Sequence, residues 1–115
     1  MHEMTVARSV VDAIEAAIAA GRVAGRVRRV VLRVGRLRAV APKSLRFLFP
    51  LAAEGTPLAG SALDIVEVAV RGRCERCAGE FVLEAPRFLC PGCGAAEIAV
   101  TAGDELTIES VEVDR

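Results

Sequence analysis

The chain has 115 residues, of which 53% are hydrophobic, and its 15 basic and 15 acidic residues give a net charge of zero at pH 7. This length allows one domain, or one domain with a small module, and the hydrophobic content supports a buried core. With four Phe and no Trp or Tyr, the chain offers no tyrosine proton donor for catalysis and no Trp or Tyr platform for stacking bases.

The chain opens with Met1, His2 and Glu3, which bring several metal donors together, and His2 is its single histidine. The α-amine, the backbone nitrogen of His2 and its imidazole would close two small chelate rings in one plane. Planar nitrogen donors suit Ni(II) or Cu(II) rather than tetrahedral zinc. Glu3 adds a carboxylate, which the positive end of a helix dipole also favours. His2 alone is weak evidence, because a second residue more often belongs to a frayed terminus.

Hydrophobic periodicity predicts a first helix from about Thr5 to Ala20, where apolar residues recur every three or four positions. Residues 26–38 are rich in β-branched residues and are predicted to form a strand. Pro42 suits the first turn of a second helix, whose apolar residues include Leu45, Leu48 and Leu51. Within it, Pro50 predicts a kink or an early stop, because an interior proline removes a hydrogen bond.

Two further strands are predicted at residues 61–70 and 105–113, and the segment between them holds every cysteine. The expected fold class is α+β: a small three-stranded sheet with two helices and an inserted zinc-ribbon module. The expected domains are residues 1–71 with 103–115, and residues 72–102.

Charge is uneven along the chain. Every charged residue between Ala16 and Ala53 is basic, whereas most from Glu54 onward are acidic. A nucleic-acid surface is one interpretation of the basic segment. Pairing between neighbouring strands is favoured, because the basic residues are spaced between apolar ones. Docking of Arg22–Arg46 on an acidic partner is a further, weaker hypothesis.

No run approaches the roughly 18 apolar residues of a membrane-spanning helix. The N-terminus also lacks the basic region and apolar core of a signal peptide. We therefore expect no membrane partner and a cytoplasmic location, where thiols stay reduced.

Four cysteines form two C-x-x-C pairs separated by twelve residues, Cys74 with Cys77 and Cys90 with Cys93. A short hairpin, with residues 80–84 and 87–89 as its arms, would bring the two pairs together. Four thiolates in a tetrahedron are a structural zinc site with no open position. The spacing also fits an iron tetrathiolate, a redox dithiol or two disulfides, although a reducing compartment disfavours disulfides.

An enzyme is not expected. A catalytic triad would need a histidine away from the terminus, and four thiolates close the coordination of zinc. The chain has no Walker A sequence. The remaining classes are a zinc-ribbon protein that binds nucleic acid or acts as an adaptor, and a metal-delivery protein. The second is favoured, because residues 72–102, which hold the cysteines, carry four glutamates against three arginines and are not basic.

The whole chain resembles the HypA/HybF family of nickel metallochaperones for NiFe-hydrogenase maturation. The resemblance rests on the two C-x-x-C pairs and on four further segments: Met1-His2-Glu3-Met4, Val34-Gly35-Arg36-Leu37, Pro42 with Ser44-Leu45-Arg46-Phe47, and Gly103-Asp104-Glu105-Leu106.

This resemblance implies that His2 and the α-amine of Met1 bind Ni(II) as transient cargo, with Glu3 as a further candidate ligand. It implies that the four cysteines bind structural Zn(II). Residues 1–71 and 103–115 would then be a nickel-binding domain, and residues 72–102 a zinc-binding domain. It also implies a HypB-type GTPase and the hydrogenase large subunit as partners, no nucleic acid, and a monomer or weak homodimer. Some relatives also serve urease. Unlike some relatives, this chain has no histidine beside its cysteines, so no histidine can exchange into the zinc site.

Overall fold

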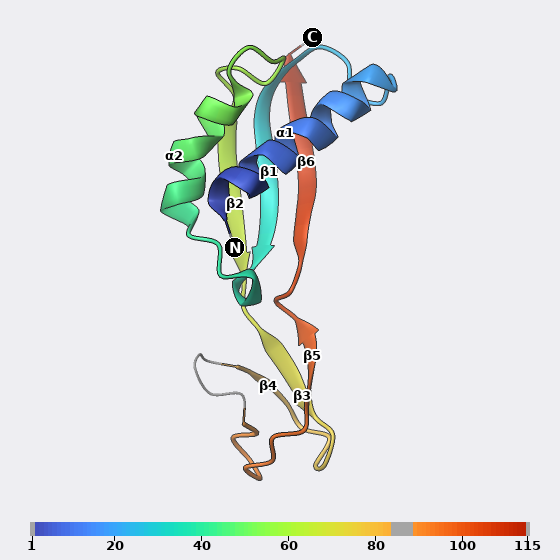
Figure 1. The fold of residues 1–115 in the computed structure, drawn as a ribbon. Helices are drawn as coiled ribbons and strands as arrows, with labels where there is room; N and C mark the ends of the chain where they lie inside the picture. The colour runs from blue at the N-terminus through green and yellow to red at the C-terminus, as the bar shows by residue number, and fades with distance from the viewer. Residues whose placement is uncertain (1, 84–88, 115) are drawn as a thin grey trace. The chain divides into compact units, whose positions relative to one another are not determined.

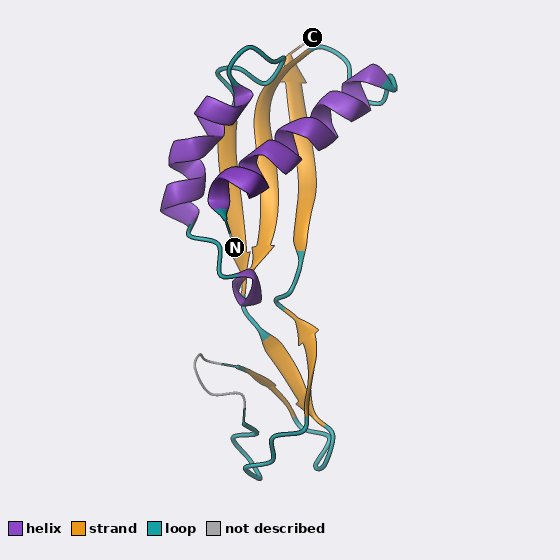
Figure 2. Ribbon diagram, in the orientation of Figure 1, coloured by secondary structure: helices purple, strands orange, loops and turns teal. Residues whose placement is uncertain are grey.

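The computed structural model describes residues 2–83 and 89–114. The chain divides into two compact units, which Figures 1 and 2 draw as ribbons. The first unit takes residues up to 33, 40–66 and from 107 on, and the second takes residues 34–39 and 67–106. This division does not test metal binding. The predicted nickel-binding and zinc-binding domains therefore stay predictions.

The first unit contains two helices and a three-stranded sheet in the order β2-β1-β6. Figure 1 shows both helices on the same face of that sheet. The α+β prediction of two helices and three strands is therefore confirmed. The elements are α1 (Glu3–Ala19), β1 (Arg26–Gly35), α2 (Pro42–Ala53), β2 (Ala62–Val68) and β6 (Leu106–Asp114). The 3-10 helix η1 (Arg36–Arg38), which follows β1, belongs to the second unit.

The α1 helix buries one apolar stripe against the core and ends where the sequence predicts. Gly21 follows its C-cap Ala20 with a φ of 75°, a left-handed conformation that glycine adopts without steric cost. The residues of this stripe alternate with exposed charged residues such as Arg8 and Asp12. The buried positions of the helix are Val6, Ala7, Val10, Val11 and Ile14.

The β1 strand stops at Gly35, three residues before the predicted end, so that part of the prediction was wrong. The N–H of Gly35 donates to the carbonyl oxygen of Glu105 over 2.6 Å. A Cβ at position 35 would collide with the backbone carbonyl of Gly103. The two backbones approach so closely that only glycine fits, and the chain then turns into η1.

The α2 helix runs through Pro50 to Ala53. Of the predicted kink or early stop at this proline, the early stop was therefore wrong, and the kink stays a prediction. Pro50 removes the usual donor to the Arg46 carbonyl, but both residues are exposed and water can reach that oxygen. The spacing of the buried residues also differs from the expected Leu45, Leu48 and Leu51. Burial follows every fourth residue instead: Leu45, Phe49 and Ala53.

The sheet face away from the helices carries ion pairs between its strands. Arg29 pairs with Asp64 of β2 and with Glu112 of β6, and Arg33 pairs with Glu109 of β6. The basic strand therefore lies between two strands that supply carboxylates, which confirms the predicted pairing of basic and acidic segments across the sheet. All these side chains are partly exposed, so each pair contributes at most about 1 kcal/mol.

The second unit contains a separate antiparallel sheet in the order β4-β3-β5. Its strands are β3 (Arg71–Cys74), β4 (Glu80–Val82) and β5 (Ile98–Ala102). The predicted hairpin lies partly outside the described residues, because residues 84–88 are not described. In the part that is described, β4 pairs with β3. Among the described helices of the whole chain, none is long and apolar enough to cross a membrane.

Candidate metal centre

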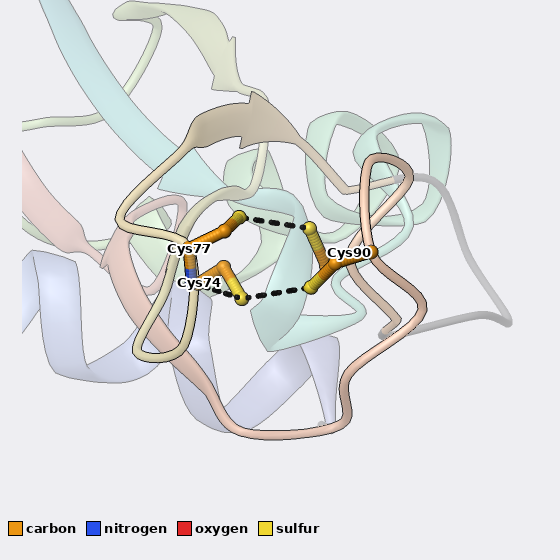
Figure 3. Close-up of side chains that lie close together, drawn as sticks. Cys74, Cys77 and Cys90 are labelled. Carbon is orange, nitrogen blue, oxygen red and sulfur yellow. Dashed lines mark hydrogen bonds between the residues drawn. The ribbon is translucent and has the colours of Figure 1, made fainter.

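The four cysteines lie together in the second unit, with all four sulfurs within 4.8 Å of one another. Cys74 Sγ lies 3.6 Å from Cys93 Sγ, and Cys77 Sγ lies 3.6 Å from Cys90 Sγ. Figure 3 shows Cys74 and Cys77 facing Cys90 across this cluster. These separations exceed the roughly 2.05 Å of a disulfide bond, and all four cysteines are free.

Each cysteine pair is held in a turn with the same hydrogen bonds. In the first turn, Ala78 N–H donates to the Cys74 carbonyl over 2.9 Å, and Cys74 N–H donates to the Gly79 carbonyl over 2.9 Å. In the second, Gly94 and Ala95 take the equivalent places, with distances of 2.8 and 2.9 Å to Cys90. The two turns therefore present their sulfurs in the same way.

The first turn is strained where the second is not. The fourth residue after Cys74 is Ala78, with a φ of 61°. The fourth residue after Cys90 is Gly94, with a φ of 76°. A left-handed conformation costs a residue with a Cβ roughly 1–2 kcal/mol, and glycine escapes this cost. Only the loop conformation shows that position 78 favours glycine, and the sequence alone did not single it out.

We expect Ala78→Gly to raise the affinity for Zn(II) about fivefold, because relief of about 1 kcal/mol of strain favours the metal-bound turn. The matched Gly94→Ala variant should lower the affinity by a similar factor. Competition with a chromophoric chelator measures both. Equal affinities for the two variants and the wild type would show that the left-handed residues do not limit metal binding.

In each turn the pKa of the leading thiol is lowered and the pKa of the second thiol is raised. The backbone N–H of Cys93 lowers the pKa of the Cys90 thiol to about 6, and the N–H of Cys77 likewise lowers that of Cys74. The N–H of Ala95 lowers the pKa of Cys93, but the neighbouring sulfurs of Cys74 and Cys90 outweigh it and raise the value to about 12. Four adjacent thiolates therefore need a cation to balance their charge.

The donor set fits zinc. A Zn–S bond of about 2.3 Å implies tetrahedral sulfur separations of about 3.8 Å, close to the 3.6 Å seen in two of the pairs. The two leading cysteines, Cys74 and Cys90, are buried, whereas Cys77 and Cys93 are exposed. Cys74 and Cys90 pack with Ala95, Phe81 and Ile98 in the small core of this unit. A metal ion bound by all four sulfurs would therefore link the two cysteine turns beside this small core.

His2 and Glu3 lie in the first unit, at the start of α1. His2 is the N-cap residue, exposed, and its side chain makes no capping hydrogen bond. Its carbonyl accepts from Val6 N–H over 3.2 Å, which begins the helix. Glu3 is the acidic residue of the first turn. Met1 lies outside the described residues, so the structure leaves the predicted donor set of amine, His2 and Glu3 a prediction.

The sequence model of the HypA family, a hydrogenase/urease nickel incorporation metallochaperone, matches residues 1–113. The chain is 43% identical over 113 residues to the hydrogenase maturation factor HypA of Desulfosudis oleivorans, with 98% of each chain covered. It is 50% identical over 113 residues to that of Streptomyces avermitilis, with 96% of this chain and 86% of the relative covered.

The fold is similar to the solution structure of the Ni metallochaperone HypA from Helicobacter pylori. The TM-score is 0.69 at 28% identity, with 98% of this chain and 97% of that chain covered. The likeness therefore extends over both units and includes the segment that carries the cysteines. The chain belongs to the HypA family of nickel metallochaperones for hydrogenase maturation, and it carries a four-cysteine site of the zinc type.

Proposed function

We propose that this chain binds Ni(II) at its amino terminus and delivers it to the large subunit of a NiFe hydrogenase, together with a HypB-type GTPase. Zn(II) is a resident structural ion in this proposal and nickel is the cargo. Family membership supports delivery as the role, since HypA proteins are metallochaperones and not enzymes. The observation that carries the nickel site is the exposed side chain of His2, which makes no capping hydrogen bond at the start of α1.

Zn(II) is assigned to Cys74, Cys77, Cys90 and Cys93. Four thiolates leave no open coordination position, so the ion would hold the fold of the second unit and take no part in a reaction. The small core around Cys74 and Cys90 supports this role, because it offers little apolar burial of its own.

Ni(II) is assigned to the α-amine of Met1, the backbone nitrogen and imidazole of His2, and Glu3 as a further candidate ligand. The first N–H groups of a helix have no partner within the helix, so the His2 amide can lose its proton without breaking a hydrogen bond of α1. The helix dipole favours the resulting negative charge. Exposure of His2 lets a partner compete for the metal.

The same proposal places the protein in the cytoplasm, where the thiols stay reduced until zinc binds. The partners are a HypB-type GTPase and the hydrogenase large subunit, with no nucleic acid or membrane surface. Urease is a second possible recipient, because the matching family model describes incorporation into both enzymes. A monomer or weak homodimer suits a protein that passes its cargo to larger partners.

The test is a Ni(II) titration of untagged, zinc-loaded protein, followed by d–d absorbance, beside the same protein with an N-terminal tag. The untagged chain should show one saturable band typical of planar nitrogen ligation, and the tagged chain should lack it, because the tag converts the α-amine into an amide. The same band in both proteins would place the nickel elsewhere. No band in either would favour a zinc-ribbon adaptor, with nucleic-acid binding as the next assay.

A further inference from the structure

The outer face of α2 carries apolar side chains that neither the core nor the metal donors use. Phe47 is 75% exposed and Leu51, one turn further on, is 54% exposed. Phe47 also lines a shallow hollow of about 340 Å³ with Lys43, Ser44 and Leu48. A large aromatic side chain this exposed, beside a hollow, is typical of a protein interaction surface.

This exposure is not a by-product of core packing. The buried side of α2 is formed by Leu45, Phe49 and Ala53, and Phe47 is not part of it. Burying an aromatic ring is worth several kcal/mol, and leaving one in water forgoes that stabilisation. The ring is therefore best explained by a partner that covers it.

Charge indicates the chemistry of that partner. Lys43 and Arg46 border the apolar surface, and α2 contains no acidic residue. Both cations are exposed, and within the residues that the structure describes neither forms an ion pair. This differs from β1, where Arg29 and Arg33 are paired with carboxylates. A partner segment that joins apolar side chains with carboxylates would satisfy both features of α2.

We propose that the outer face of α2 docks an acidic, apolar segment of the GTPase partner, an inference that rests on the proposed function. A metallochaperone has to hold its partner without using the groups that release the metal. This face carries no metal donor, whereas His2 and the four cysteines lie on other elements. A small apolar surface bordered by two cations suits a contact that forms and breaks at each transfer.

The test measures binding of the purified GTPase by wild-type protein and variants at several salt concentrations. Phe47→Ser should weaken binding at least about tenfold, as loss of an aromatic anchor does. Lys43→Glu with Arg46→Glu should slow association and remove most of its salt dependence. Val82→Ser removes another exposed apolar side chain and Arg8→Glu reverses another exposed cation, so both should bind as wild type.

Circular dichroism and the nickel titration should be unchanged in Phe47→Ser, because the side chain lies outside the core. If the wild type binds the GTPase and the α2 variants bind equally well, the docking surface is wrong and the proposed partner stands. If the wild type does not bind, both fail. A wild-type dimer in sedimentation equilibrium that Phe47→Ser dissociates would assign the surface to a second copy of this chain and overturn the proposal.

Discussion

The Cys90→Ser variant is expected to lose stoichiometric zinc and to unfold the second unit. Cys90 is 4% exposed and packs in the small core with Cys74 and Ala95. Structural zinc supplies about 10–16 kcal/mol of apparent folding free energy in comparable small sites, which is as much as a whole domain often has. Serine offers no thiolate, so the tetrahedron opens and most of this stabilisation is lost.

Metal analysis and the dispersion of amide resonances measure the two effects. Resonances of β3 and β5 should collapse, while those of α1 keep their dispersion, because the first unit has its own core of α1, β1 and α2 residues. Arg76→Ala is the control, since it removes an exposed ion pair with Glu97 from the other cysteine turn, touches no thiolate and should keep full zinc. A Cys90→Ser protein that retained tightly bound zinc would show that the ligand assignment is wrong.

The His2→Ala variant is expected to lose specific nickel binding while keeping its fold and its zinc. Removal of the imidazole removes one nitrogen donor and the second chelate ring, so only the α-amine and the amide nitrogen of residue 2 remain. Loss of an outer partner of a metal ligand already costs about 10–100-fold in affinity, so loss of the ligand itself should exceed about 100-fold. The fold should survive, because the side chain is exposed and makes no capping hydrogen bond.

Isothermal titration calorimetry with Ni(II) measures the loss of nickel affinity. The midpoint of thermal unfolding measures whether the fold is kept. Glu3→Gln is the matched control in the first turn of α1. It keeps the imidazole and both backbone donors, so it should retain planar nickel binding and separate the contribution of the carboxylate. A folded His2→Ala protein with wild-type nickel affinity would contradict the N-terminal site, and an unfolded one would show that His2 has a structural role.

Local patterns were enough to predict most elements of the first unit. The period of apolar residues in α1 and Gly21 after it specify a helix and its end, because both signals act over a few residues. The separation of basic and acidic segments predicted their pairing, because cross-strand attraction depends on side-chain charge alone. The C-x-x-C spacing likewise predicted a cluster, since each pair closes its own turn.

Other features depend on neighbours that are distant in the sequence. The end of β1 depends on Gly103, whose backbone meets Gly35 from far along the chain. In α2, the choice of Phe49 over Phe47 for the core depends on the side of the helix that faces α1 and the sheet. Whether Pro50 ends a helix depends on solvent reaching the unpaired carbonyl, which its exposed position allows.

The sequence by itself determined the helices and strands of the first unit, the two cysteine pairs and the resemblance to the HypA family, because these are encoded in short segments. Only the tertiary structure decided that four sulfurs from two turns meet within 4.8 Å, that Ala78 is held in a left-handed conformation, and that Phe47 is left uncovered beside two exposed cations. The reason is that burial and close approach are properties of the packed chain, and they are set by contacts between segments that local sequence does not specify.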